Sequence, residues 1–244
     1  MDTNITVVIP SYNQEPYLAD CINSVLTQTV KPHEIIVVDD GSTDNSLEIA
    51  KQFPVKVVSQ VNKGLASARN TGIMNSTGTW ILPLDSDDML MENCIERLTK
   101  EIENQKYNKI FDGKCSDVIG LSFKEFGLGI AEVILMPSPG IEDFKVANRI
   151  GYCSLIKKEA LLEVGGYSPK MIHGYEDFHL TFNLLNLGKR ITTIKDIMWM
   201  YRVKEHSMIH DAQKHHVELM TQIAVDFPRI FPEVAKIASP LPKA

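Results

Sequence analysis

Four short apolar runs, separated by helical patterns, restrict the folds open to this chain more than any other feature. They are residues 5–10 (ITVVIP), 34–39 (EIIVVD), 55–60 (VKVVSQ) and 79–84 (TWILPL). Apolar, β-branched runs of this length are typical of buried strands. Strands that alternate with helices form a parallel sheet with right-handed crossovers. We therefore expect an α/β fold in which ligands bind at the carboxyl ends of the strands.

Helical periodicity predicts the elements between and after these strands. Leu18, Cys21, Ile22 and Val25 recur at helical spacing. Further helices are predicted at 64–74, 91–106, 158–164, 177–187 and 211–227, and further strands at 118–123, 132–136, 191–196 and 197–203.

Length and charge limit the class of protein. A chain of 244 residues makes one large domain or two small ones. The net charge of −6 creates no basic field that would attract nucleic acid. The four scattered cysteines form neither a zinc pattern nor a dense disulfide framework. With no signal-peptide pattern and no apolar run long enough to span a bilayer, we expect a cytoplasmic protein. Peripheral contact with the inner membrane face stays open.

An acidic cluster follows the fourth strand. Asp85, Asp87 and Asp88 come directly after the apolar run that ends at Leu84. If the extended backbone continues, Asp85 and Asp87 point the same way and could hold Mg²⁺ or Mn²⁺. The alternative is a helix cap, for which Asp88 is the better candidate, at the start of the 91–106 helix.

The other strand ends carry polar groups of the same kind. Asp39 and Asp40 close the second strand, where they could accept hydrogen bonds from ring N–H groups of a base. The alternative is a structural role in the turn that follows. Tyr12 follows the first strand and could stack on a base, although the segment could equally be a plain turn. Arg69 lies on the 64–74 helix, where it could bind phosphate or be a solvated arginine.

In combination, these stretches resemble a known family. The segments PSYNQEPYLADCINSVLTQT, EIIVVDDGSTDNS, NKGLASARNTGI and LDSDD, in this order and spacing, closely resemble inverting glycosyltransferase family 2 across residues 5–90. The resemblance implies a GT-A (Rossmann-like) fold, a mostly parallel sheet flanked by helices. It also implies a donor-binding half at 1–105 and a mixed acceptor-binding, catalytic half at 106–244.

The resemblance also implies roles in binding a nucleotide-sugar. Tyr12 would stack near the base, Asp40 would accept from a base N–H, and Asp87 would ligate the metal. The remaining implied donor-site residues are Pro10, Asp39, Arg69, Asp85 and Ser86.

The stretch GGYSPKMIHGYEDFHL, residues 165–180, resembles the second motif of the family. Asp177 matches the general base, which removes the proton of the acceptor hydroxyl as that oxygen attacks the anomeric carbon. Glu176 would orient groups or touch the acceptor. The alternative role of both residues is favourable charge at a helix N-terminus. Asn148 is among the residues of 107–160 that could also meet an acceptor.

The third motif departs from the family pattern. Tyr201, Arg202 and Ser207 match, but the position where many members carry histidine holds Lys204. Either Lys204 neutralises the diphosphate directly, or a small loop shift brings in His206. His210, His215 and His216 are expected on a solvated helix face.

These expectations together predict a metal-dependent inverting glycosyltransferase. Its donor would be a UDP-sugar, its cofactor Mn²⁺ or Mg²⁺, and its acceptor a glycan or glycolipid in surface polysaccharide biosynthesis. A non-catalytic nucleotide-sugar binding protein is the main alternative. A nucleotidyltransferase fits less well because PSYNQ is neither glycine-rich nor basic.

Overall fold

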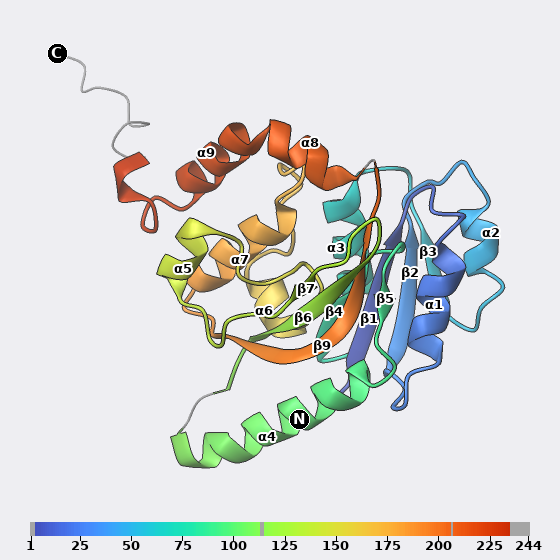
Figure 1. The fold of residues 1–244 in the computed structure, drawn as a ribbon, viewed down its shortest axis with the longest axis horizontal. Helices are drawn as coiled ribbons and strands as arrows, with labels where there is room; N and C mark the ends of the chain where they lie inside the picture. The colour runs from blue at the N-terminus through green and yellow to red at the C-terminus, as the bar shows by residue number, and fades with distance from the viewer. Residues whose placement is uncertain (1–2, 113–114, 206, 235–244) are drawn as a thin grey trace.

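The computed structural model of the chain describes residues 3–112, 115–205 and 207–234, and one curled sheet runs through it (Figure 1). Its strand order is β3-β2-β1-β4-β8-β6-β9-β5, with β7 paired to β6. The strands are β1 (Ile5–Ser11), β2 (Glu34–Asp39), β3 (Lys56–Ser59), β4 (Trp80–Pro83), β5 (Met89–Leu90), β6 (Val118–Gly127), β7 (Glu132–Val133), β8 (Ser154–Lys157) and β9 (Ile191–Val203).

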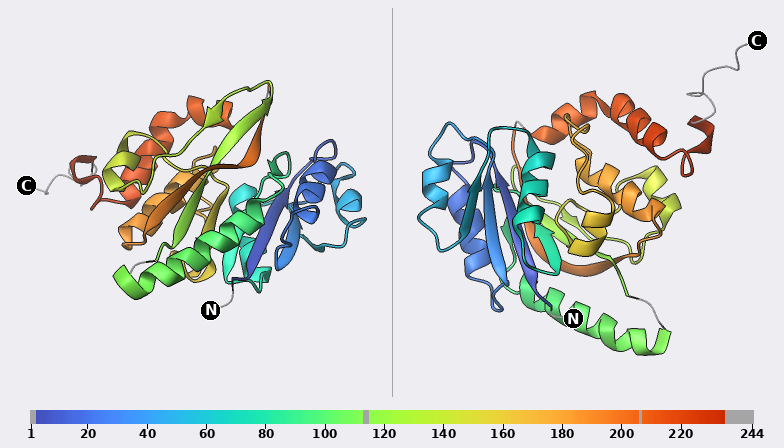
Figure 2. Two further views of the ribbon diagram at one scale, coloured as in Figure 1. Left: turned by 60° about the horizontal axis from the view of Figure 1, so that its bottom comes forward. Right: turned by 180° about the vertical axis from the view of Figure 1, so that it is seen from behind.

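Helices cover both faces of this sheet, as Figure 1 and the view from behind in Figure 2 show. The helices are α1 (Leu18–Leu26), α2 (Ser46–Ala50), α3 (Leu65–Asn75), α4 (Cys94–Asp112), α5 (Ile141–Val146), α6 (Lys158–Glu163), α7 (Glu176–Asn186), α8 (Met208–Lys214) and α9 (His216–Asp226). One apolar core contains side chains of α1, α2 and α4, and a second contains side chains of α3, α6, α7 and α9.

Strand β1 shows why its sequence lacks polar alternation. Val7 and Ile9 pack into the core beneath α1 and α4, whereas Val8 packs into the opposite core. Helix α3 lies so close to this strand that a Cβ on Gly72 would be 2.2 Å from Val8 Cγ1. Both faces of β1 are therefore covered, as expected for a central strand of a parallel sheet.

The carboxyl ends of β1, β2 and β4 meet at one edge, as the strand pattern predicted. Strand β1 pairs in parallel with both β2 and β4, and Ser11 lies opposite Asp39. Beyond the strands, Asp40 N–H donates to the Ser11 carbonyl oxygen at 2.8 Å. The loops that begin with Tyr12, Asp40 and Asp85 therefore start side by side.

The second half of the chain extends the same sheet. Strand β8 pairs antiparallel with β4, and β6 then pairs antiparallel with β8 and in parallel with β9. The two strands predicted at 191–196 and 197–203 are one strand, β9, with irregular register opposite Leu121–Phe123. The single helix predicted at 211–227 is wrong, because α8 and α9 are separated at His215.

Three short elements were not predicted from the sequence. Helix α5 and strands β5 and β8 carry too few residues to show a clear period. The prediction of a donor half at 1–105 and an acceptor half at 106–244 stays a prediction.

Among the described residues, no helix is both long and apolar enough to cross a bilayer.

Candidate active site

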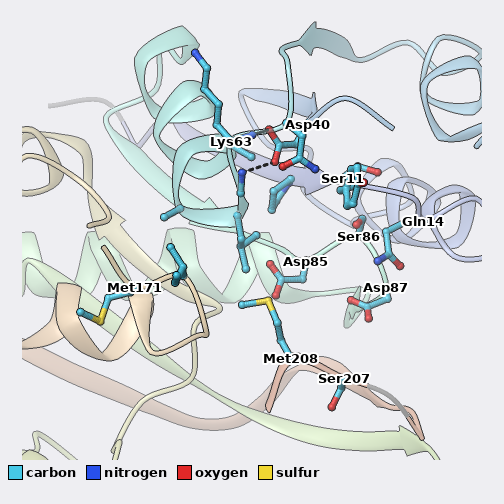
Figure 3. A pocket seen from close by; sticks show the side chains of 18 of the residues that line it. Ser11, Gln14, Asp40, Lys63, Asp85, Ser86, Asp87, Met171, Ser207 and Met208 are labelled. Carbon is cyan, nitrogen blue, oxygen red and sulfur yellow. Dashed lines mark hydrogen bonds between the residues drawn. The ribbon is translucent and has the colours of Figure 1, made fainter. Parts of the chain in front are cut away.

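A cavity of about 680 Å³ opens at the shared edge of β1, β2 and β4 (Figure 3). The start of α3, the loop before α7 and the segment from β9 into α8 form its other walls. Seven residues predicted for the site line it: Pro10, Tyr12, Asp40, Asp85, Ser86, Asp87 and Lys204. The family-matched Tyr201, Arg202 and Ser207 also line it, together with Ser11, Gln14, Lys63 and Met208, which the sequence did not single out.

The loops after β1 and β2 hold each other in place. Asn13 adopts φ +52°, which is uncommon for a residue other than glycine. Its Oδ1 accepts from Thr43 N–H at 2.8 Å, and its own N–H donates to Ser42 Oγ at 3.0 Å. Tyr12, 45% exposed, thus projects at the cavity from a loop with fixed geometry.

Asp39 and Asp40 are equally buried but serve different segments. Asp40 accepts hydrogen bonds from the N–H groups of Lys63 and Gly64, at 2.9 and 2.8 Å, and from the Gln60 side chain at 2.7 Å. It therefore fixes the turn that starts α3 while lining the cavity. Asp39 accepts from Ser42 N–H at 3.2 Å and does not line the cavity.

Asp85 is joined to the second half of the chain through Arg69. Arg69 is 1% exposed, and it donates to Asp85 Oδ1 at 2.7 Å and to Glu176 Oε1 at 2.5 Å. Its guanidinium lies 5.1 and 5.2 Å from the ring centroids of Tyr152 and Tyr167. Burial raises the pKa of Asp85 to about 6, against the opposing charge of Arg69.

Arg69 does not line the cavity, so its predicted approach to the nucleotide stays a prediction. Its observed contacts place it between Asp85, at the wall of the cavity, and Glu176, at the start of α7.

Asp87 lines the cavity and pairs with the side chain of Lys204. Its Oδ2 lies 2.5 Å from Lys204 Nζ, and Arg202 Nε donates to the Asp87 carbonyl oxygen at 2.8 Å. Asp87 and Lys204 retain 19% and 24% side-chain exposure. Lys204 therefore lines the cavity with its amino group paired to Asp87, and its predicted role at the diphosphate stays a prediction. The other candidate, His206, lies outside the described residues.

Asp88 does not cap a helix, and that prediction is wrong. It accepts from the Tyr152 hydroxyl and, at 2.7 Å, from Arg202 N–H, whereas α4 begins six residues later at Cys94. Burial, followed by the charge of Asp87, raises its pKa to about 8. Asp88 instead ties the acidic loop to β9 and to Tyr152.

Asp177 lies in the first turn of α7, next to Glu176. The turn before it is strained, with φ +62° at Tyr175, a conformation typical of functional turns. Asn148 donates to Asp177 Oδ2 at 3.1 Å, and Phe178 N–H donates to Oδ1 at 2.8 Å. Burial and then the charge of Glu176 raise the pKa of Asp177 to about 7.

Asp177 does not line the cavity. It is connected to the cavity through Glu176, Arg69 and Asp85, in that order. The Asp177 carboxylate, with its pKa raised to about 7, therefore lies outside the cavity and is linked to the cavity wall at Asp85.

Reasoning from the sequence missed two supporting residues. Tyr152 donates to Asp88 through its hydroxyl, which also accepts from Asp85 N–H at 3.1 Å, yet it lies in a region without periodicity. Gln60, which contacts Asp40, could have been found because it ends the third predicted strand beside the second.

Known proteins resemble this chain along most of its length. Residues 6–165 match the sequence profile of the family described as "Glycosyl transferase family 2". Glycosyltransferase GlyG of Streptococcus pneumoniae serotype 4 is 33% identical over 225 residues, which cover 86% of this chain and 74% of GlyG. Glycosyltransferase GlyA of the same organism is 46% identical over 107 residues, 42% of this chain, and the match spans only 15% of GlyA.

The fold also matches that of a solved structure. S. aureus TarS 1–349, crystallised in complex with UDP-GlcNAc, superposes with a TM-score of 0.76 at 21% identity, covering 95% of this chain and 71% of that one. This likeness confirms the predicted α/β fold of the GT-A type. The profile match and the similarity to GlyG go further than the fold, and they show that the chain belongs to glycosyl transferase family 2.

Proposed function

We propose that this chain is a metal-dependent inverting glycosyltransferase that moves a sugar from a UDP-sugar to a hydroxyl of a glycan or glycolipid. The observation that carries the proposal is one cavity lined by Asp40, Asp85 and Asp87, with Asp177 connected to it through Arg69. Carboxylates at the ends of parallel strands supply both nucleotide and cation recognition. Surface polysaccharide or glycolipid assembly is the setting that we propose for this reaction.

The nucleotide would bind between Tyr12 and Asp40. An exposed aromatic ring offers a stacking surface for a base. The Asp40 carboxylate is held by two backbone N–H groups and could also accept from a pyrimidine ring N–H. Within the described residues, the buried Ser11 hydroxyl that lines the cavity has no hydrogen-bond partner, which a ligand hydroxyl or phosphate would supply. The TarS complexes with UDP and UDP-GlcNAc favour uridine as the base.

The acidic loop fits a hard divalent cation. Asp87 offers a partly exposed carboxylate in the cavity, and Asp85 lines the same wall, which suits Mg²⁺ or Mn²⁺. When bound, such a cation would neutralise the diphosphate leaving group. Lys204 and Arg202 add positive charge at this wall of the cavity.

Asp177 would act as the base of a single displacement. It takes the proton from the acceptor hydroxyl as that oxygen attacks the anomeric carbon, while the bond to the diphosphate oxygen breaks and UDP leaves. Attack opposite the leaving group inverts the anomeric centre, so an α-linked donor yields a β-linked product. Asn148, which holds Asp177 Oδ2, positions the carboxylate.

The direct test is UDP release from a panel of UDP-hexoses and UDP-N-acetylhexosamines, with Mn²⁺ or with EDTA. We expect release with one donor, its loss in EDTA, and its loss in Asp87→Asn and Asp177→Asn. Asp196→Asn is the matched control, because this aspartate is 59% exposed and pairs with Arg97 at the surface. Equal release by wild type and Asp177→Asn with every donor would contradict the assignment of the base.

The same panel separates the alternative functions. Donor binding by calorimetry without any release of UDP would indicate a nucleotide-sugar binding protein. Pyrophosphate, in place of UDP, among the products would indicate nucleotidyl transfer. Full activity in EDTA would show that Lys204 and Arg202 suffice for the diphosphate.

A further inference from the structure

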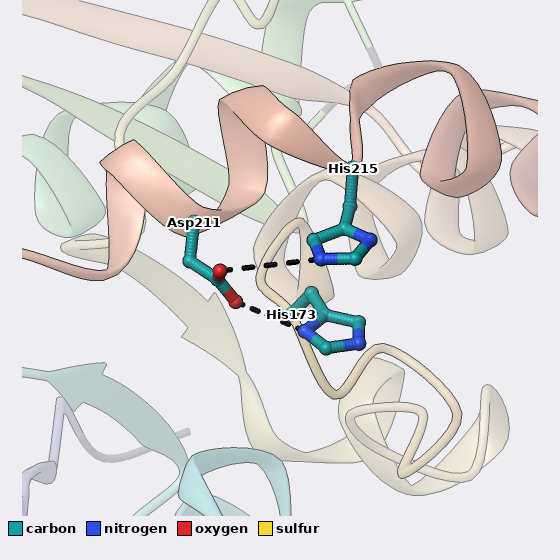
Figure 4. Close-up of side chains that lie close together, drawn as sticks. All are labelled: His173, Asp211 and His215. Atoms are coloured by element: carbon teal, nitrogen blue, oxygen red, sulfur yellow. Dashed lines mark hydrogen bonds and ion pairs between the residues drawn. The ribbon is translucent and has the colours of Figure 1, made fainter.

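A second group of possible metal ligands lies outside the donor cavity. His173, in the loop before α7, meets Asp211 and His215 at α8 (Figure 4). One ligand atom from each lies within 4.8 Å of the others. His173 Nδ1 is 2.9 Å from Asp211 Oδ2, and His215 Nε2 is 4.0 Å from Asp211 Oδ1. His215, which was expected on a solvated helix face, keeps 36% side-chain exposure and stacks on the His173 ring with a centroid distance of 3.9 Å.

The surroundings of His215 favour a ligand role. Its Nδ1 lies 3.1 Å from Glu218 Oε2. Donation of Nδ1–H to Glu218 puts the lone pair on Nε2, which is the nitrogen that faces Asp211. Histidines that bind metals usually donate their other ring N–H to a carboxylate in this way. Glu218 thus prepares Nε2 to bind a cation.

Packing beneath the cluster already brings the two segments together. A Cβ on Gly174 would lie 2.8 Å from Ala212 Cβ, and Ala212 is 2% exposed. Gly174 has φ +116°, a conformation that other residues rarely adopt. The backbone therefore fixes the distance between the loop and α8 without a metal, and only side-chain rotations are needed for coordination.

We propose that His173, Asp211 and His215 form a binding site for a divalent transition-metal ion, Zn²⁺ above all, with water as the fourth ligand. Two imidazoles and one carboxylate are a common zinc ligand set, whereas the oxygen-only set of the acidic loop suits Mg²⁺ or Mn²⁺. Ligands of one tetrahedral zinc ion, each about 2 Å from the metal, are about 3.3 Å apart. The observed separations lie on both sides of that value, so small rotations would satisfy it.

The site would connect two walls of the donor cavity. Met171 and Ile172 line the cavity directly before His173, and Ser207 and Met208 line it one turn before Asp211. A bound ion would therefore clamp the start of α8 to the loop that precedes Asp177. Binding of Zn²⁺ should raise the melting temperature and slow amide exchange in α8.

The test is a titration of the metal-free chain with Zn²⁺ at pH about 7.5, where imidazole is neutral and able to bind metal. Excess Mg²⁺ and UDP are present to occupy the donor cavity. We expect one equivalent to bind in wild type, and no stoichiometric binding in His173→Gln or His215→Gln. Glu218→Gln should weaken the affinity by about 10- to 100-fold. His210→Gln, an exposed histidine of the same helix, is the matched control and should bind like wild type.

A spectroscopic readout identifies the ligands without an activity assay. Co²⁺ in this site should show the intense visible bands of tetrahedral coordination, which His215→Gln should abolish while its circular dichroism remains that of wild type. Absence of Zn²⁺ binding in wild type, or equal binding by His215→Gln, would overturn the proposal and leave the cluster an ion-pair network. Asp87→Asn should retain Zn²⁺ binding, so failure of the donor-site assignment is distinguishable from failure of this site.

Discussion

The two halves of this molecule build their parts of the site in different ways. In the first half of the chain, Asp40 follows β2, and Asp85 and Asp87 follow β4, so that parallel pairing with β1 brings the three to one edge. In the second half, Asp177 lies in the first turn of α7 and Lys204 directly follows β9, and their partners come from distant segments. Local sequence pattern is therefore enough to place Asp40, Asp85 and Asp87. The positions of Asp177 and Lys204 depend on how β8, β6 and β9 complete the sheet.

Arg69 is where the two halves meet. It belongs to helix α3 of the first half, and its guanidinium donates hydrogen bonds to Asp85 and to Glu176 of the second half. The buried guanidinium of Arg69 thus links the acidic loop to the start of α7. Replacing Arg69 tests whether function depends on this link between the two halves.

The largest effect is expected from Arg69→Met. Loss of the guanidinium leaves the buried Glu176 and the partly buried Asp85 without their cation, which should cost about 3–5 kcal/mol of unfolding free energy. Activity should fall as well, because both the acidic loop and the start of α7 lose their anchor. Urea denaturation and UDP release measure the two effects. Arg97→Met removes a side chain that is 31% exposed and pairs with Glu101 and Asp196, which are 24% and 59% exposed, so it should cost no more than about 1 kcal/mol. An equal cost for both variants would refute the link through Arg69.

Asp177→Asn should separate catalysis from donor binding. The amide cannot accept the acceptor proton, so kcat should fall by about 10²- to 10⁴-fold while donor affinity stays near wild type. Initial rates and calorimetry with the UDP-sugar provide the two readouts. A large loss of donor affinity with unchanged kcat would instead place Asp177 on the donor side.

The matched variants Asp40→Asn and Asp39→Asn test whether Asp40 contacts the nucleotide. Both aspartates are 3% exposed, but only Asp40 lines the cavity and fixes the turn at Gly64. Replacing Asp40 should weaken UDP binding by about 1.5–3 kcal/mol, because a charged acceptor is lost. Asp39→Asn should change it little, and fluorescence titration with UDP compares them. Equal losses of UDP affinity would show that replacing a buried carboxylate, and not losing a contact with the nucleotide, explains the effect of Asp40→Asn.

The smallest expected effect is the pH dependence that Asp177 imposes. Its pKa of about 7 means that activity should fall about tenfold for each unit of pH below that value. Since its folded pKa exceeds the unfolded value of 3.8, the folded state binds more protons between these values, and this group lowers stability as pH rises through them. Asp177→Asn should therefore be no less stable than wild type above pH 7, and activity that is flat across this range would contradict the base assignment.

Much of the donor side could be predicted from the sequence because its signals are local. The apolar run before Asp85 indicates a buried strand, and the known geometry of parallel sheets then places the acids at one edge. Boundaries were least certain where tertiary contacts decide them, as at α4, predicted at 91–106 and found at Cys94–Asp112. Asp88 was assigned to a cap because its proximity to a helix is visible in sequence, whereas its actual partners, Tyr152 and Arg202, are more than sixty residues away.

The alternation of strands and helices, the family and the residues at the strand ends can all be recognised in the sequence, because periodicity and motif spacing are properties of neighbouring residues. The buried link that Arg69 makes between Asp85 and Glu176, and the contact of His173 with His215, became visible only in the folded chain. These contacts join segments more than forty residues apart, or bring a loop against a helix, and no local preference encodes them. They follow from the packing of the complete sheet and its helices, which sets the distances at which such side chains can interact.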